Sequence, residues 1–329
     1  MRLRELGEFG LIDRIAGQVD GKAGVRLGIG DDAAVLDPSP GQVTLTSTDM
    51  LVEEVHFDLS LCDPHSLGRK SLAVNLSDIA AMGGRPRYAL LSLAVPPELP
   101  VEFLDGFTAG FLEMAARFEV ALVGGDTCSS RKGLVIAVTI MGEQSPDRFV
   151  PRSGARPGDL IFVTGTLGDS ALGLKLLREG ERAGGPVERH LDPLPRVREG
   201  LALAEAGLPT AMIDVSDGLL ADLGHILDLS GVGATVELAR LPLSPSFFAQ
   251  IPRLDDDPYL FPLAGGEDYE LLFTAPPDRA DAVREALAPF GTPVTTIGEI
   301  TAAGVRVVGA DGNDHPVAAR GYNHFSPVD

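Results

Sequence analysis

The feature that most constrains the fold is a single change of composition across residues 143–158. This segment reads Glu-Gln-Ser-Pro-Asp-Arg-Phe-Val-Pro-Arg-Ser-Gly-Ala-Arg-Pro-Gly, with three prolines, three arginines and few aliphatic residues. Such a composition is typical of a linker or an interdomain loop. On both sides of it, short apolar runs alternate with segments of helical periodicity. We therefore expect two domains of α/β (α+β) class, 1–150 and 151–329, each large enough to bury its own core.

The expected elements alternate in both halves. In the first half, helices are expected at 6–18, 64–82 and 101–118, and strands at 43–51, 88–95, 120–123 and 134–141. In the second half, strands are expected at 160–164, 211–214, 234–238, 269–275, 293–299 and 305–308. Helices are expected to end near 178 and to span 196–206, 218–230 and 278–289. The aromatic residues of the 101–118 helix are expected to form core.

The charge, apolar runs and cysteines of the chain argue against several classes of protein. Its 47 acidic and 27 basic residues give a formal net charge of −20, which is unsuited to binding nucleic acid phosphates. No apolar run approaches the roughly 20 residues of a membrane helix, and the N-terminus lacks the apolar core of a signal peptide. The two cysteines form no metal-binding or disulfide pattern. We expect a cytoplasmic protein with no membrane partner.

Residues 28–35, Gly-Ile-Gly-Asp-Asp-Ala-Ala-Val, imitate the dinucleotide-binding spacing G-x-G-x-x-G/A. A dinucleotide loop offers bare backbone N–H groups to a pyrophosphate, whereas Asp31 and Asp32 would repel it. The apolar run that follows ends at Asp37-Pro38, so no helix begins here. Two carboxylates beside flexible glycines suit a hard divalent cation instead. We interpret Asp31 and Asp32 as the beginning of a magnesium site.

Acidic turns recur along the chain. Strands are expected to end in such turns at Asp31-Asp32, Ser47-Thr48-Asp49, Gly124-Gly125-Asp126 and Asp214-Val215-Ser216-Asp217, and Asp78 joins them from a helix. Any one of these turns alone is weak evidence for a metal site, and Asp217 could simply cap the following helix. Together they would suffice for several magnesium ions that bridge a triphosphate. The P-loop, protein-kinase and metalloprotease signatures, a nucleophile elbow and a Cys-His pair are all absent from the sequence.

The ordered motifs resemble those of the thiamine-monophosphate kinase family, in the superfamily of aminoimidazole-ribonucleotide synthetase and selenophosphate synthetase. The likeness covers nearly the whole chain. The matching segments are Gly7–Phe9, Leu27–Asp32, Ser47–Asp49, His56-Phe57, Ala73–Gly83, Gly124–Thr127, Arg152–Ala155, Val163–Gly165, Asp214–Leu219, Gly265–Leu271 and Gly321–Phe325. The segments Gly265–Leu271 and Gly321–Phe325 point to this kinase in particular, although Asn323 stands where many relatives have Asp.

The resemblance implies ATP-dependent phosphorylation of thiamine monophosphate to thiamine diphosphate. It also implies an N-terminal mixed sheet with helices that pairs in a homodimer, and a C-terminal α/β sandwich that completes the active site. Carried over position by position, magnesium would be bound by Asp32, Ser47, Thr48, Asp49, Asp78, Asp126, Asp214 and Asp217. ATP would be contacted by Gly125, Asp126, Arg152 and Ser216, and thiamine monophosphate by His56, Glu267 and Tyr322.

Simpler roles stay open for several of these residues. Arg152 could be a solvated linker side chain, His56 a satisfied core residue, and Tyr322 a tail aromatic that packs on the core. The substrate phosphate is already ionised near neutral pH, so we expect direct in-line transfer with no covalent nucleophile and no general base.

Two alternatives remain, another synthetase of the superfamily and a non-catalytic binding module. A selenide-using enzyme should carry a reactive cysteine near its N-terminus, whereas the first cysteine here is Cys62. A hydrogenase-maturation relative should end in cysteine, whereas this chain ends in Asp329. The purine synthetase is disfavoured by Gly265–Leu271, and the full set of acidic turns argues against a binding module.

Overall fold

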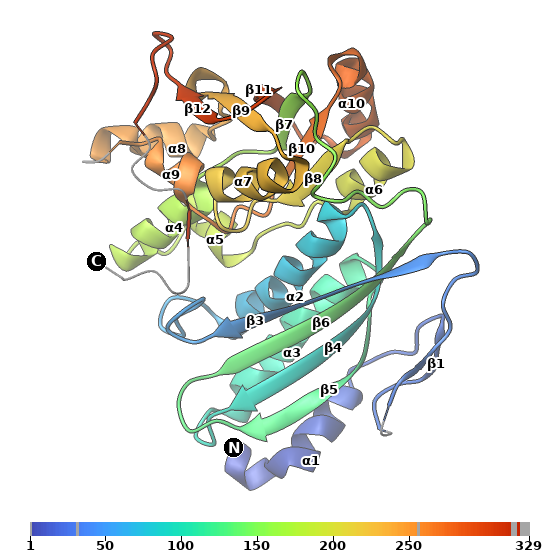
Figure 1. Ribbon diagram of the computed structural model, residues 1–329. Coiled ribbons are helices and arrows are strands. Elements are labelled where there is room, and N and C mark those ends of the chain that lie inside the picture. Colours follow the sequence, from blue (N-terminus) through green and yellow to red (C-terminus); the bar gives the residue numbers. More distant parts are fainter. Residues whose placement is uncertain (1, 31–32, 255–256, 317–320, 323–329) are drawn as a thin grey trace. The chain divides into compact units, whose positions relative to one another are not determined.

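The fold is known from a computed structural model, which describes the chain except for residues 1, 31–32, 255–256, 317–320 and 323–329 (Figure 1). The chain divides into two units. The first comprises Met1–Ile79 and Gly84–Asp147, and the second comprises Ala80–Gly83 and Arg148–Asp329.

The first unit is built on a four-stranded mixed sheet. Its strands lie in the order β3 (Val43–Val52), β6 (Val135–Gln144), β4 (Arg85–Val95) and β5 (Ala121–Ser129). The β3–β6 and β6–β4 pairs are antiparallel, and the β4–β5 pair is parallel. Helices α2 (Pro64–Ala81) and α3 (Val101–Arg117) cover one face (Figure 1). The remaining elements are α1 (Leu3–Ala16) and the short strands β1 (Val25–Leu27) and β2 (Val35–Leu36).

Side-chain alternation explains how this sheet is covered. Along β6, Ile136, Val138 and Ile140 are buried, while the residues between them are only partly buried. Successive side chains of a strand point to opposite faces, so these three pack on the side of α2 and α3. Phe107 and Phe111 of α3 are at most 1% exposed, which confirms these two aromatic residues as core, whereas Phe103 and Phe118 are only partly buried.

The second unit contains a six-stranded sheet. Its order is β12 (Val305–Val308), β9 (Gly233–Glu237), β11 (Val294–Thr301), β7 (Leu160–Thr164), β10 (Leu271–Ala275) and β8 (Ala211–Asp214), with only the β12–β9 pair parallel among the strands described. The helices are α4 (Asp169–Arg178), α5 (Gly185–Leu191), α6 (Val197–Glu205), α7 (Leu219–Ser230), α8 (Pro245–Gln250), α9 (Leu260–Ala264) and α10 (Ala280–Leu287).

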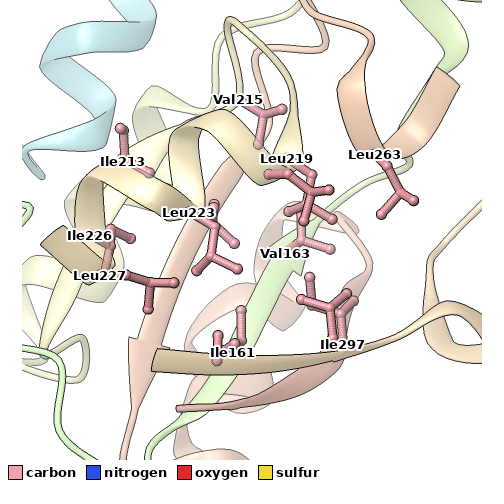
Figure 2. Packing of buried hydrophobic residues seen from close by; sticks show 14 of the residues in the cluster. Ile161, Val163, Ile213, Val215, Leu219, Leu223, Ile226, Leu227, Leu263 and Ile297 are labelled. Atoms are coloured by element: carbon pink, nitrogen blue, oxygen red, sulfur yellow. The ribbon is translucent and has the colours of Figure 1, made fainter. Parts of the chain in front are cut away.

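The core of the second unit lies between α7 and the sheet. Figure 2 shows Leu219, Leu223 and Ile226 of α7 among Ile161 and Ile213 from the strands. These five side chains are at most 1% exposed. Full burial of such a side chain stabilises the fold by about 1.5–3 kcal/mol. This packing fixes the start of α7, and therefore the loop between β8 and α7.

Two expectations about local structure are wrong. Ser47-Thr48-Asp49 and Gly124–Thr127 lie inside β3 and β5, and not in turns after them. Both are edge strands, since β3 pairs only with β6 and β5 only with β4 in the described sheet. An edge strand tolerates polar and glycine residues that a central strand would not, so the polar composition misled the interpretation. Helices α5, α8 and α9 were not expected either, because each has only five to seven residues.

Neither cysteine forms a disulfide, which agrees with the expectation from their spacing. Within the described ranges, no helix combines the length and apolarity that crossing a membrane requires.

Candidate active site

The first unit brings Ser47, Asp49 and Asp78 together. Ser47 and Asp49 lie on the α2 side of β3, and Asp78 is on α2. The Ser47 hydroxyl donates a hydrogen bond to Asp78 Oδ2 at 2.5 Å. The Asp49 backbone N–H donates to Asn75 Oδ1 at 3.2 Å, and the Asn75 amide donates to the carbonyl of Ser71 at 3.0 Å. The helix α2 is thereby tied to β3 at the level of the two carboxylates.

The electrostatics of this cluster favour a cation. Burial, and then the nearby charge of Asp78, raise the pKa of Asp49 to about 6. Both effects penalise the negative charge, and a divalent cation would relieve both. Carboxylate and hydroxyl oxygens are the ligands that magnesium prefers. Among the described residues, no three His, Cys, Asp or Glu side chains converge as a metal site.

Thr48 and Asp126 lie away from this cluster. The register places Asp49 in a row with Val138, Leu91 and Gly125. Asp126 is one residue further along β5, and alternation turns its side chain to the opposite face. Asp49 and Asp126 also lie on opposite edge strands, three strand spacings or roughly 14 Å apart. The Thr48 hydroxyl is also on this second face of the sheet, the one opposite α2 and α3. It donates to the carbonyl of Val138 at 3.0 Å.

Two further residues of the first unit have structural partners. A Cβ atom on Gly125 would lie 1.7 Å from the carbonyl oxygen of Leu91, so the pairing of β5 with β4 itself requires glycine here. His56 follows β3, and its Nδ1 accepts a hydrogen bond from the backbone N–H of Val52 at 3.0 Å. That bond fixes the ring relative to the end of β3.

The second unit gathers most of its predicted site residues on three loops. The loop after β8 carries Ser216 and Asp217, and two other segments bind to its carbonyl groups. Glu267 N–H donates to the carbonyl of Ser216 at 2.8 Å, and Tyr322 N–H donates to the carbonyl of Asp217 at 3.0 Å. Asp214, at the end of β8, is 3% exposed. Candidate residues for magnesium, ATP and thiamine monophosphate therefore lie side by side within one unit.

The segment that carries Glu267 is held in a strained conformation. Glu267 and Tyr269 have φ of 68° and 50°, in the left-handed region that costs a residue with a side chain about 1–3 kcal/mol. Gly266 passes so close to the loop after β8 that a Cβ atom there would lie 2.3 Å from the carbonyl oxygen of Ser216. Strain of this kind persists only where the surroundings enforce it, and it is frequent at functional sites.

Buried polar residues behind this segment were not identified from the sequence. Asp268 accepts hydrogen bonds from the backbone N–H groups of Gly168 at 2.7 Å and Ser170 at 3.1 Å, at the start of α4. Burial raises the pKa of Asp268 to about 8. His190 Nδ1 lies 3.1 Å from Ser170 Oγ and 3.3 Å from Glu267 Oε2. Both neighbours contact the same ring nitrogen, so the three residues do not form a Ser-His-Glu proton relay.

A buried ion pair holds Glu270, two residues after Asp268. Arg196 donates to Glu270 at 2.6 Å from Nε and at 2.5 Å from Nη2, while the hydroxyl of Thr164 donates to the same carboxylate at 2.7 Å. Arg196 and Glu270 are 6% and 1% exposed. Their separation of 74 residues left no spacing signal in the sequence.

Arg152 and Asp32 complete the predicted set. Arg152 is exposed, and the carbonyl of its neighbour Pro151 accepts a hydrogen bond from Met212 N–H at 3.1 Å. The linker is thus attached to β8, the strand that leads to Asp214. Asp31, Asp32 and Asn323 lie outside the described residues.

Comparison with known proteins agrees with this arrangement. Residues 30–144 match the family described as AIR synthase related protein, N-terminal domain, and residues 156–310 match its C-terminal domain. The two units and their sheets are therefore those of a two-domain protein of the AIR synthase related type.

Comparison with individual proteins identifies the family more narrowly. The chain is 40% identical to thiamine-monophosphate kinase of Escherichia coli (strain K12), over 97% of this chain and 98% of that protein. The solved structure of thiamine-monophosphate kinase from Stenotrophomonas maltophilia K279a has a TM-score of 0.83 at 40% identity, and the match covers 93% of this chain and 96% of that one. The structure of AaThiL complexed with AMPPCP and TMP has a TM-score of 0.77 at 36% identity, with 99% of both chains covered. The chain belongs to the thiamine-monophosphate kinase family.

Proposed function

We propose that this chain phosphorylates thiamine monophosphate to thiamine diphosphate at the expense of ATP. The observation that carries the proposal is the attachment of Glu267 and Tyr322 to the backbone of Ser216 and Asp217. Candidate acceptor-binding residues thereby adjoin candidate nucleotide- and metal-binding residues, as transfer between two bound phosphates requires. The relative AaThiL has been solved with AMPPCP and TMP together, which supports the same pair of ligands here.

The chemistry is direct in-line transfer assisted by several magnesium ions. The acceptor phosphate of thiamine monophosphate is ionised near neutral pH, so the step needs positioning and charge neutralisation, and no general base. Magnesium, when bound, neutralises the charge that builds up on the transferring phosphoryl group. Asp214 and Asp217 would hold it in the second unit, and Ser47, Asp49 and Asp78 in the first. The resemblance also assigns Asp32, Thr48 and Asp126 to magnesium, although Thr48 and Asp126 lie on the other face of the sheet from Ser47, Asp49 and Asp78.

The remaining residues bind the two substrates. Gly125, Asp126, Arg152 and Ser216 are assigned to ATP, where Arg152 would pair with phosphate charge. His56, Glu267 and Tyr322 are assigned to thiamine monophosphate, and the planar ring of Tyr322 suits the cationic thiazolium. Tyr322 is 54% exposed.

We also propose a cytoplasmic homodimer. The second face of the first unit's sheet supports the dimer, because Thr48 is exposed on it and Met50 is 58% exposed. Light scattering at several concentrations tests this assignment. A Met50→Asp variant should shift the mass toward the monomer, whereas a monomeric wild-type chain would contradict it. The two unpaired cysteines support a reducing compartment.

The deciding experiment measures ADP release with magnesium and ATP in four parallel reactions. One contains no acceptor, and the others contain thiamine monophosphate, thiamine or the aminoimidazole precursor. Release with thiamine monophosphate alone, lost in Asp49→Ala, is expected. Release with the purine precursor alone would contradict the substrate assignment, and silence in every reaction would favour a binding module. Quench-flow with labelled ATP tests the mechanism, because a stable labelled protein is incompatible with direct transfer.

A further inference from the structure

His190 is a buried histidine that none of the resemblance-based assignments uses. It lies in the last turn of α5, and its side chain is 8% exposed. Its Nδ1 atom lies 3.1 Å from the hydroxyl oxygen of Ser170, in the first turn of α4, and 3.3 Å from Oε2 of Glu267. The Glu267 side chain is 26% exposed. The histidine is therefore the inner member of the pair, and Glu267 is the member that solvent reaches.

Close packing of α4 against α5 fixes the place of the His190 ring. A Cβ atom on Gly173 of α4 would lie 2.1 Å from the carbonyl oxygen of Pro186 on α5, so the two helices touch backbone to backbone. Ser170 lies three residues before Gly173, and His190 lies four residues after Pro186. Each therefore shares a helix face with the point of contact. The packing of the two helices brings the imidazole and the hydroxyl together.

The contact with Glu267 determines which form of the imidazole fits. A histidine nitrogen donates when it carries a proton and accepts when it does not, whereas a serine hydroxyl can do either. Ser170 is therefore compatible with both forms of Nδ1. An ionised carboxylate only accepts, so a bare Nδ1 would set two lone pairs against each other at 3.3 Å. A proton on Nδ1 makes the same contact attractive.

The backbone of Glu267 is held by contacts that do not involve its side chain. Its N–H donates to the carbonyl of Ser216 at 2.8 Å, and the carboxylate of the next residue, Asp268, accepts from the N–H of Ser170 at 3.1 Å. These bonds fix the position of the Glu267 backbone. The glutamate side chain still has several rotatable bonds, and a contact at the carboxylate restricts the conformations that it populates. His190 supplies such a contact.

We propose that His190 is a positioning residue that acts through Glu267, because a proton on its Nδ1 holds the carboxylate in the orientation that receives the acceptor substrate. The inference rests on the proposed function for the identity of that substrate, thiamine monophosphate. In this assignment His190 touches neither substrate. Its removal should therefore weaken binding of the acceptor and leave binding of the nucleotide unchanged, a distinction that a residue needed only for folding would not produce.

The binding test is a double-mutant cycle of His190→Ala and Glu267→Ala, with His225→Ala as the control. His225 is an exposed histidine of α7 with no assigned role. Calorimetric titrations measure the dissociation constant of AMPPCP with magnesium, and that of thiamine monophosphate with magnesium and AMPPCP present. A residue that acts only through its neighbour has no further effect once that neighbour is removed, so the cycle tests the proposed route directly.

We expect His190→Ala to raise the dissociation constant of thiamine monophosphate about tenfold and that of AMPPCP less than about twofold. In the Glu267→Ala background, the same substitution should change the first constant less than about twofold. His190→Asn places an amide donor near the position of Nδ1, so its loss should be smaller, about threefold. Equal losses for the two ligands, or additive losses in the cycle, would overturn the positioning role.

Ring-nitrogen NMR examines the pair without any ligand. The chain has six histidines, so the His190 signals are identified as those missing from His190→Asn, and the measurement does not depend on the folding of His190→Ala. At pH 8, where a histidine without a carboxylate neighbour is mostly neutral, we expect Nδ1 of His190 to carry a proton in wild type. In Glu267→Ala the Ser170 hydroxyl can donate to Nδ1, so we expect Nδ1 to be bare.

A bare Nδ1 in wild type would overturn the inference, and so would a protonated Nδ1 that is unaffected by Glu267→Ala. Failure of the proposed function is visible separately, as a wild-type chain that neither binds thiamine monophosphate nor releases ADP with it. The nitrogen signals then still decide whether His190 holds the Glu267 carboxylate.

Discussion

At the scale of single residues, buried carboxylates carry out two different tasks in this protein. Asp49 and Asp78 are neighbouring negative groups on β3 and α2, where a cation would relieve their repulsion. Asp222 and Asp268 instead accept backbone N–H groups and hold loops in place. The first pair should matter for ligand binding, and the second pair for the shape of the site. Substitution by asparagine separates the two tasks, because it keeps the shape and removes the charge.

Asp49→Asn should strongly reduce magnesium-dependent turnover without loss of stability. Removal of a ligand charge weakens the metal site, and we expect ADP release to fall by about 100-fold, equivalent to about 2.7 kcal/mol. The raised pKa of Asp49 means that its charge is unfavourable in the folded chain, so the melting temperature should stay equal or rise. Calorimetry and the ADP assay measure the two quantities. Exposed Asp147→Asn is the control, and a destabilised but active Asp49→Asn would contradict the assignment.

Asp268 should make stability depend on pH. Its pKa is raised by burial to about 8, against about 3.9 for an unfolded chain. The folded state binds this proton more tightly, so the contribution is complete below about pH 4 and is lost as pH rises through 8. The free energy of unfolding of wild type should therefore fall from pH 6 to 9 relative to Asp268→Asn, by at most about 1.4 kcal/mol per pH unit. Urea denaturation checks this, and parallel profiles for the two proteins would rule it out.

At the scale of elements, the candidate site residues lie either in loops directly before or after strands or within edge strands. The loop between β8 and α7 is fixed at one end by the packed helix and at the other by the edge strand of the six-stranded sheet. The segment before β10 then binds along it. In the first unit, polar residues instead lie within the edge strands β3 and β5. Substitutions in β5 should therefore report on strand pairing as well as on ligand binding.

Gly125→Ala should weaken the pairing of β5 with β4. The added Cβ would lie 1.7 Å from the carbonyl oxygen of Leu91, so backbone must move, and we expect a loss of about 1–3 kcal/mol in the free energy of unfolding. Gly21→Ala is the matched control, because its Cβ would meet no atom within 4 Å. Urea denaturation distinguishes the two variants. Full stability of Gly125→Ala with loss of AMPPCP binding would assign the glycine to the ligand alone.

At the scale of the whole molecule, the sequence predicted the layered architecture and not the interactions that hold the site. Strands such as Leu160–Thr164 and Ala211–Asp214 were predictable because each is a short apolar run with clear ends. The edge strands were misjudged because their polar residues resemble turns. The contacts of Asp268 with Gly168 and Ser170 were not predictable, since the partners are 98 to 100 residues apart. Residue types indicated the chemistry, whereas chain topology determined which residues meet.

Breaking the buried ion pair of Arg196 and Glu270 should strongly destabilise the second unit. Arg196→Met leaves the Glu270 carboxylate without its two strongest donors, and breaking a buried pair costs about 3–5 kcal/mol. Arg189 Nη1, at 3.8 Å, is too far away to replace both bonds. The double variant with Glu270→Gln should recover much of the loss. Thermal unfolding measures both variants, and equal melting temperatures for wild type and Arg196→Met would contradict the expectation.

The close approach of Gly266 to the Ser216 carbonyl constrains how the site can be altered. Any side chain at position 266 would push the two loops apart, so the segment that carries Glu267 cannot drift independently of the loop that carries Ser216. A variant with an altered loop at one side must therefore keep glycine at this point or change both loops together. Glycine at position 266 thus sets the spacing between the two loops, although it contributes no side chain to either of them.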